Sequence, residues 1–224
     1  MEKMKYRITS ETKVVDNITL HRIECVTAFS DVECGEKGGW IESEKNLSQD
    51  GNAWVYESAK VSGNAWVREN AKVSGDAKVS GNAKVSGNAW ISGFSTVSGD
   101  AKVSGNAKVS GNATVSDNAT VCENATVSGD AKVSGNATVS GNATVRGYAW
   151  ISGFSTVRGY AWISGNATVS GNATVSGDAW ISGNAKVSGD AKVSGDAWVC
   201  GNAWVCENAD FIVFKNWWSS GRYF

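Results

Sequence analysis

Residues 111–128 read GNATVSDNATVCENATVS, which is three successive forms of one six-residue unit. The unit, Gly-(Asn/Asp)-Ala-x-Val-Ser, runs without insertion or deletion from Gly51 to about Ala209. Its aliphatic position returns at every sixth residue from Val55 to Val205, which makes 26 consecutive hexads in one register. Self-similarity at a short fixed period predicts a solenoid, in which each unit packs against its neighbours.

Each hexad predicts one short strand and one corner. Ala113 and Val115 are two residues apart and share a face of an extended segment, whereas Thr114 between them points the opposite way. Gly111 and Asn112 are expected to turn the chain, because both tolerate the left-handed backbone region. Strands this short must stack on copies of themselves at about 4.8 Å, which predicts a parallel β-solenoid.

The pattern resembles that of the hexapeptide-repeat, left-handed β-helix family over residues 51–209, although here Ser follows the aliphatic residue where that family commonly has Gly. The resemblance implies triangular 18-residue coils, nearly nine of them, and a left-handed winding that the period alone does not set. Residues 28–59, AFSDVECGEKGGWIESEKNLSQDGNAWVYESA, are similar to the start of YdcK-like hexapeptide-repeat proteins. This second resemblance supports the fold and leaves the function open.

Three segments are expected along the chain: a β-rich N-terminal cap at 1–50, the repeat at 51–209, and an aromatic C-terminal cap or association segment at 210–224. Caps are expected because the open end of a solenoid is a template for aggregation. Ile41 and Leu47 are six apart, which predicts a first, imperfect coil before the regular repeat. In the C-terminal segment, the aromatic residues would either cover the last coil or dock onto another chain. The candidate association residues are Phe211, Phe214, Trp217 and Trp218.

Composition excludes several classes of protein. A formal net charge of −1 offers no argument for a nucleic-acid partner. No apolar run approaches the length of a signal peptide or a membrane span, so we expect a cytoplasmic protein without a membrane partner. The five cysteines lack CxxC spacing and are interpreted as reduced thiols, and no metal or cofactor is expected.

The residue between Ala and Val is Trp in eight hexads, Lys in nine and Thr in nine, and it is expected to face solvent in every hexad. With 18 residues per coil, Trp162, Trp180 and Trp198 would stack on successive coils. The Lys residues are interpreted as a solvated face that opposes aggregation. Four acidic residues each stand two positions before a Lys and would neutralise it locally: Asp76, Asp100, Asp130 and Asp190.

An aromatic and Arg-rich surface is therefore the candidate interaction site, since such composition is typical of protein interfaces and of stacking surfaces for sugars or bases. Its members are Trp162, Trp180, Trp198, Tyr148, Phe154, Tyr160, Arg146 and Arg158. The alternative is that the Trp side chains only stabilise the sheet through contacts between neighbouring strands.

The favoured function is a non-enzymatic rigid scaffold that presents an ordered surface to a protein partner or to a second copy of itself. Acyltransferases of the hexapeptide class resemble this chain, but such enzymes work with a His general base, and the single histidine, His21, lies outside the repeat. A carbohydrate, nucleotide or ice-binding surface is a further alternative, although Trp and Lys interrupt every row of Thr. No motif in the sequence indicates a particular small-molecule ligand.

Overall fold

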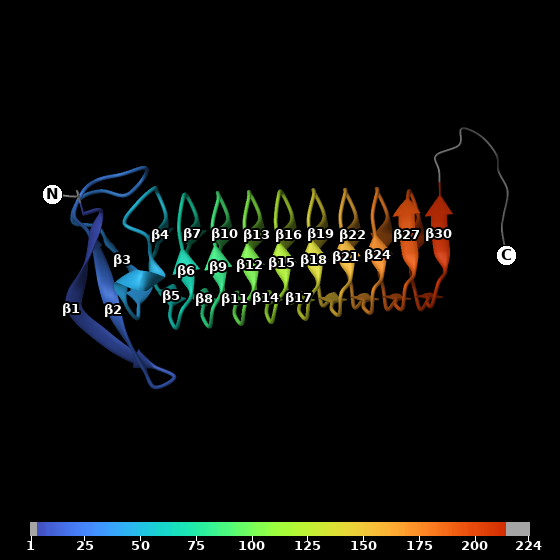
Figure 1. Cartoon of the computed structure of the whole chain (residues 1–224), viewed down its shortest axis with the longest axis horizontal. Coiled ribbons are helices and arrows are strands. Elements are labelled where there is room, and N and C mark those ends of the chain that lie inside the picture. The colour runs from blue at the N-terminus through green and yellow to red at the C-terminus, as the bar shows by residue number, and fades with distance from the viewer. Residues whose placement is uncertain (1–3, 214–224) are drawn as a thin grey trace.

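The computed structural model describes residues 4–213. Its coils stack in a straight row along the long axis of the molecule, from the N-terminal strands β1 and β2 at one end to β30 at the other (Figure 1). Within the described residues the one helical element is the short 3-10 helix η1 (Glu44–Asn46). The predicted all-β parallel solenoid with a β-rich N-terminal cap is confirmed.

The strands form three walls, which we call faces 1, 2 and 3. Their pairing is parallel except at the N-terminal end of face 1, where β1 pairs with β2 and β2 with β3 in antiparallel fashion. Face 1 contains, in spatial order, β1 (Tyr6–Val15), β2 (Ile18–Cys25), β3 (Lys37–Ile41), β5 (Lys60–Val61), β8 (Lys78–Val79), β11 (Thr96–Val97), β14 (Thr114–Val115), β17 (Lys132–Val133), β20 (Trp150–Ile151), β23 (Thr168–Val169), β26 (Lys186–Val187) and β29 (Trp204–Val205). Face 2 contains β4 (Trp54–Val55), β7 (Lys72–Val73), β10 (Trp90–Ile91), β13 (Lys108–Val109), β16 (Thr126–Val127), β19 (Thr144–Val145), β22 (Trp162–Ile163), β25 (Trp180–Ile181) and β28 (Trp198–Val199). Face 3 contains β6 (Trp66–Val67), β9 (Lys84–Val85), β12 (Lys102–Val103), β15 (Thr120–Val121), β18 (Thr138–Val139), β21 (Thr156–Val157), β24 (Thr174–Val175), β27 (Lys192–Gly195) and β30 (Asp210–Val213).

Neighbouring strands of a face are one coil apart, as in the parallel pair of Ile91 with Val109. The predicted 18-residue coil is therefore confirmed. One further coil precedes the regular repeat, because Ile41 pairs with Val61 and Leu47 forms a bridge with Val67. This is the imperfect first coil that the spacing predicts, and it brings the solenoid to about ten turns.

The core is a column of Ala and Val or Ile side chains that are fully buried through nearly the whole repeat. Two hexads replace Ala by Ser, and both hydroxyls are buried. Ser95 donates to the carbonyl of Ser92 at 2.8 Å, and Ser155 donates to that of Ser152 at 2.7 Å. Each buried hydroxyl therefore has a hydrogen-bond partner at the adjacent corner, which removes most of the cost of burying it.

The corners depend on glycine in the left-handed region. Gly105, for example, has φ +69°, and a Cβ atom there would lie 2.8 Å from the backbone nitrogen of Glu123 in the next coil. The expectation that the hexad Asn residues share this conformation is wrong, because none of them has a positive φ. They instead form ladders in which the side-chain amide of one coil donates to the next, as from Asn88 to Asn106 at 3.0 Å.

Five corners carry an acidic residue in place of this glycine, and each has a positive φ: Glu57, Glu69, Asp117, Glu123 and Glu207. The carboxylates of the first four each accept a hydrogen bond from the backbone N–H of the glycine one coil later, as at Gly135 N, 3.0 Å from Asp117 Oδ2. A charge-assisted hydrogen bond offsets the cost of the left-handed backbone for a residue with a side chain.

The N-terminal strands extend face 1 beyond the first coil, and the loop that follows β2 reaches over the start of face 2. There Trp54 is fully buried, 6.2 Å from the ring of Tyr6 and 5.5 Å from that of Phe29 between centroids. The expectation that every residue between Ala and Val faces solvent is therefore wrong at Trp54. The tertiary contact with the cap removes this side chain from water.

Candidate functional site

Face 2 carries a row of three stacked tryptophans in its C-terminal half, which we call the Trp ladder: Trp162, Trp180 and Trp198. The rings of Trp162 and Trp180 lie 5.6 Å apart at 25°, and those of Trp180 and Trp198 lie 5.4 Å apart at 59°. The parallel pairing of β22 with β25 and of β25 with β28 sets this spacing. The sequence predicts this row, and the structure brings the three residues together.

Arg146 covers the N-terminal end of the Trp ladder, with its guanidinium 4.3 Å from the centroid of the Trp162 ring. The exposed fraction then rises along the row, from the half-buried Trp162 through 38% at Trp180 to 69% at Trp198. A hollow of about 150 Å³ lies between Trp180, Ser182, Trp198 and Cys200. The C-terminal end of the Trp ladder is therefore its accessible end.

The other aromatic residues of the predicted surface occupy three different corners, and each is at least two-thirds exposed. Tyr160 lies between faces 3 and 2, and Tyr148 between faces 2 and 1, so both flank the face of the Trp ladder. Phe154 lies between faces 1 and 3, at the corner opposite face 2. Arg158 follows β21 on face 3 and is exposed. The structure thus separates Phe154 and Arg158 from the Trp ladder, because consecutive hexads occupy different faces.

Of the predicted association segment, Phe211 lies in β30 and is 40% exposed, next to Ile212, which is 48% exposed. Phe214, Trp217 and Trp218 lie outside the described residues. In the last coil Trp204 is 70% exposed and Ala203 is also exposed, whereas Ala residues of the earlier coils are buried. Apolar surface therefore gathers at the C-terminal end of the described solenoid.

The expected pairing of each Asp with the Lys two residues later is not found. Asp76 instead pairs with Lys60 of the preceding coil at 3.9 Å. The other three accept hydrogen bonds from an Asn amide one coil earlier, in the pairs Asn82 to Asp100, Asn112 to Asp130, and Asn172 to Asp190. Asp100, Asp130 and Asp190 therefore belong to the Asn ladders, because a corner side chain lies nearest to its counterpart in the adjacent coil.

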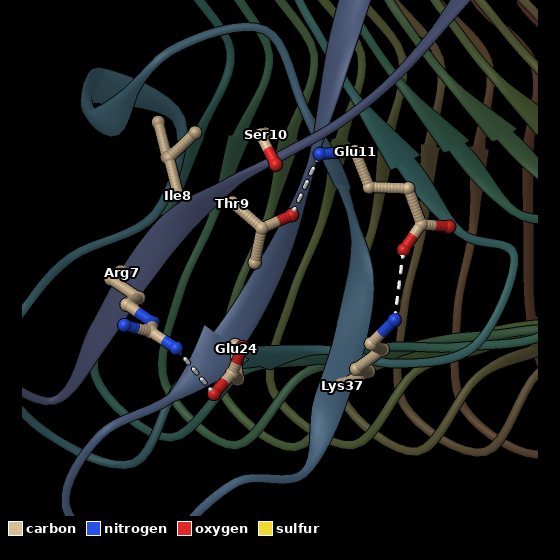
Figure 2. Close-up of a pocket in the computed structure, with 7 residues that line it drawn as sticks. All are labelled: Arg7, Ile8, Thr9, Ser10, Glu11, Glu24 and Lys37. Atoms are coloured by element: carbon tan, nitrogen blue, oxygen red, sulfur yellow. Dashed lines mark hydrogen bonds and ion pairs between the residues drawn. The ribbon is translucent and has the colours of Figure 1, made fainter.

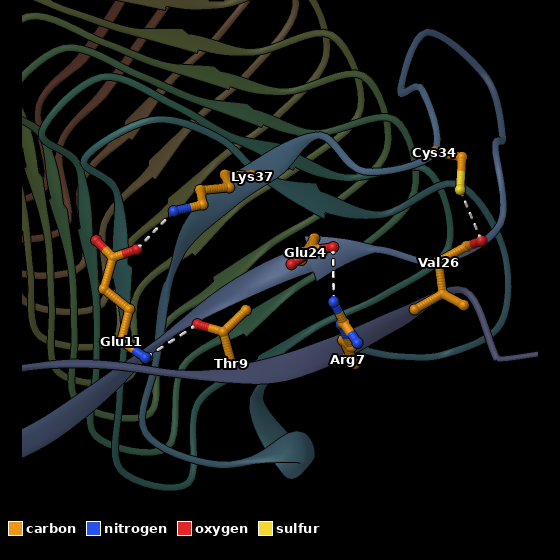
Figure 3. A network of polar contacts seen from close by, with 7 residues as sticks. All are labelled: Arg7, Thr9, Glu11, Glu24, Val26, Cys34 and Lys37. Atoms are coloured by element: carbon orange, nitrogen blue, oxygen red, sulfur yellow. Dashed lines mark hydrogen bonds and ion pairs between the residues drawn. The ribbon is translucent and has the colours of Figure 1, made fainter.

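A polar hollow of about 420 Å³ lies on the N-terminal sheet, where a bulge in β1 between Ile8 and Thr12 interrupts the pairing with β2. Arg7 points toward Glu24 at 2.9 Å, and Lys37 toward Glu11 at 3.1 Å (Figure 2). Nearby, Cys34 donates to the carbonyl of Val26 (Figure 3). These charged side chains are largely exposed and pair with one another across β1, β2 and β3, so they offer few unpaired groups to a ligand. As exposed ion pairs they add little to the stability of the sheet.

A second concavity, which we call the cap groove, lies where the N-terminal loop meets face 2. It has a volume of about 510 Å³, and its lining residues are Asp31, Tyr56, Glu57, Lys72, Ser74 and Trp90. Sequence reasoning missed this groove. The sequence feature that could have indicated the groove is the corner at 56–58, where Tyr and Glu replace the usual Ser and Gly.

Asp31 is the electrostatic centre of the cap groove. It accepts hydrogen bonds from Lys72 Nζ at 2.7 and 2.9 Å and from the Tyr56 hydroxyl at 3.0 Å. The hydrogen bond from Lys72 is the main reason that the pKa of Asp31 falls to about 2, and the same contact raises the pKa of Lys72. Burial raises the pKa of Tyr56. All three groups therefore keep their usual charge states at neutral pH.

Residues 4–213 contain no cluster of three or more His, Cys, Asp or Glu side chains that could hold a metal ion. In the same residues no helix has the length and apolar character needed to cross a membrane. All five cysteines are unpaired, and Cys25 is the buried one. His21 lies in β2, opposite Thr12 and Ile41, outside the coils of the repeat.

The three stacked walls, the buried Ala/Val column and the glycine corners define a β-solenoid repeat protein. The profile of the YdcK β-solenoid repeat matches residues 107–123, 131–147, 161–177 and 169–183. The chain is also 33% identical over 66 residues to an uncharacterized acetyltransferase, YdcK, of Escherichia coli (strain K12), an alignment that covers 26% of this chain and 20% of that relative. The chain is therefore a β-solenoid repeat protein that is similar to YdcK over part of its repeat, and it aligns with about a fifth of the relative's length.

Proposed function

We propose that this β-solenoid is a non-enzymatic scaffold whose Trp ladder binds a protein partner or a second copy of the chain. The observation that carries the proposal is the continuous stack of Trp162, Trp180 and Trp198, whose outer ring is 69% exposed. Three large aromatic side chains in a row differ from the isolated hydrophobic residues that are normally scattered over a protein surface. Trp and Arg are also the residue types that most often dominate the binding energy of interfaces.

The mechanism is preorganisation. The backbone of each row is hydrogen-bonded to the rows before and after it, as Trp180 N donates to Ala197 O at 2.8 Å. The rings of Trp162 and Trp180 already stack, and Arg146 already covers Trp162. A partner that packs against this face orders few side chains, so it loses less conformational entropy on binding. The exposed Trp204 and Phe211 add apolar surface at the same end of the solenoid, on faces 1 and 3.

The test replaces Trp180 and Trp198 together by Thr, the residue that other hexads carry at this position. The expected result is an intact solenoid by circular dichroism, with loss of self-association by light scattering or of the proteins captured from the native host. Trp150→Thr is the matched control, because Trp150 is 51% exposed and lies on face 1. Equal association by the wild type and the double variant would reject the Trp ladder as the binding surface.

An acetyltransferase is the second candidate, and the name of the Escherichia coli relative is the observation that favours it. Titration of acetyl-CoA into the full chain, followed by calorimetry, distinguishes the two. Saturable binding would favour the enzyme, and a flat titration would favour the scaffold. Five unpaired thiols fit a reducing compartment, so the cytoplasm is the location that we propose.

A further inference from the structure

The cap groove is built by parts of the chain that are distant in sequence. Phe29 and Val32 form a tight antiparallel bridge, with hydrogen bonds of 3.1 and 2.9 Å, and this bridge places Asp31 at the tip of the turn. The turn is anchored because Val32 is buried and Phe29 packs on Trp54. Asp31 is thus held rigidly over face 2, as a binding group should be.

The floor of the groove is an oriented aromatic ring. The indole nitrogen of Trp90 donates to Ser74 Oγ of the preceding coil at 3.0 Å, while the side chain remains 48% exposed. Tyr56 and Lys72 lie beside it, with Lys72 Nζ 5.6 Å from the centroid of the Tyr56 ring. The groove therefore offers one fixed apolar plane with hydrogen-bonding groups around it, the usual composition of a small-molecule site.

The charges of the groove select among ligands. Asp31 and Glu57 place two carboxylates at the site, which opposes a phosphate or another anion. The ammonium group of Lys72 pairs with Asp31 and lies 5.6 Å from the centroid of the Tyr56 ring, and its charge opposes a second cation. A neutral molecule with one flat apolar face and several hydroxyl groups meets both conditions, since its hydroxyls can donate to carboxylates and accept from Lys72.

We propose that the cap groove binds a neutral sugar, with the pyranose ring stacked on Trp90 and its hydroxyl groups hydrogen-bonded to Asp31, Glu57 and Lys72. This site is distinct from the Trp ladder, whose first residue, Trp162, lies four rows further along face 2. It does not depend on the scaffold function proposed above.

The chain contains a matched control for this proposal. Residues 89–97 and 149–157 both read AWISGFSTV, so Trp90 and Trp150 have the same local sequence. Trp150 also donates to a Ser of the preceding coil, Ser134, at 3.2 Å, and it is 51% exposed. It lies on face 1, where neither Asp31 nor Tyr56 is present. The two tryptophans differ mainly in the groove around Trp90.

The experiment measures binding of cellobiose, maltose and lactose to the full chain by saturation-transfer NMR, with adenosine, choline and inorganic phosphate as competing classes. We expect at least one disaccharide to bind. Trp90→Ala should weaken that binding by at least about tenfold, the scale expected when an aromatic stacking platform is lost. Trp150→Ala should leave it within about twofold of the wild type, and Lys72→Met should weaken it as well.

Three outcomes would overturn the proposal: no disaccharide binds, the Trp90 and Trp150 variants lose binding equally, or only adenosine, choline or phosphate binds in a Trp90-dependent way. Circular dichroism of both variants shows whether the solenoid is intact. If Trp90→Ala fails to fold, Lys72→Met and Asp31→Asn provide the same comparison, because both side chains lie in the groove and are partly exposed.

Discussion

The side-chain amide of Asn106 donates a hydrogen bond of 2.9 Å to the side-chain oxygen of Asn124, its counterpart one coil later. This contact is one rung of a ladder that begins at Asn52 and runs through five hydrogen bonds to Asn142. It ends there because Tyr160 occupies the next corner. The ladder explains why Asn recurs at a corner position where the backbone itself does not require it.

Asn106→Ala should lower the free energy of unfolding, because it removes the hydrogen bond to Asn124 and also the one received from Asn88. At about 0.5–1.5 kcal/mol for each hydrogen bond, we expect a loss of about 1–3 kcal/mol, toward the lower end because the corner is exposed. Urea denaturation followed by circular dichroism measures it. Asn118→Ala is the control, since within residues 4–213 its side chain makes no hydrogen bond. Equal losses in the two variants would contradict a role for the ladder.

Gly105→Ala should destabilise the solenoid for two separable reasons. The φ of +69° is costly for a residue with a side chain, and the new Cβ atom would lie 2.8 Å from the backbone of the next coil. Gly201→Ala carries only the first cost, because its φ is +67° and, among residues 4–213, no atom lies within 4 Å of the added Cβ. We therefore expect a larger shift of the urea midpoint for Gly105→Ala. If the shifts were equal, coil-to-coil contact would not be what selects glycine here.

Trp54→Thr should destabilise the N-terminal cap by about 3–5 kcal/mol, the usual cost of truncating a buried aromatic residue. The ring is fully buried between Tyr6 and Phe29, so its loss leaves a cavity. The same substitution at the exposed Trp150 should cost little, because Thr is the residue that other hexads carry there. Amide hydrogen exchange in β1 and β2 reports on the cap directly. Unchanged exchange in the Trp54 variant would contradict the assigned packing.

The lowered pKa of Lys5 predicts that the stability of the N-terminal cap depends on pH. Burial lowers the pKa of its ammonium group to about 8, against partial opposition from Asp50, and Lys5 Nζ donates to Ala53 O at 2.9 Å. The folded pKa lies below the unfolded value of about 10.4, so the unfolded chain binds more protons between these pH values. Cap stability should therefore rise as pH increases from about 8 toward 10.

The readout for Lys5 is the NMR titration of its side chain, with an expected midpoint near pH 8. In Lys5→Met the rise in cap stability over this window should become smaller. The part that remains should come from Lys13 in β1, because burial lowers its pKa to about 8 as well. Above about pH 10 the effect should be opposed by Tyr6, because burial raises its pKa and the folded state then disfavours the phenolate. A midpoint near 10.4 for Lys5 would contradict the buried position.

The hexad alone predicts the short stacked strands, the corners and the buried column of Ala and Val, and the resemblance to the hexapeptide-repeat family adds the 18-residue coil with three faces. It does so because every regular coil repeats the same local contacts, so one unit contains most of the information about its neighbours. The alignment of Trp162, Trp180 and Trp198 follows from the 18-residue coil, because these residues are 18 positions apart. Even the imperfect first coil is predicted, from the six-residue spacing of Ile41 and Leu47.

What the hexad does not determine involves contacts that break the period. Only the tertiary structure shows that Trp54 is buried by the cap and that Asp31 pairs with Lys72. Both contacts depend on a loop whose position is set by packing between residues far apart in sequence. Periodic contacts are local and can be predicted from the sequence, whereas the cap and its groove are formed by long-range packing that the repeat does not contain.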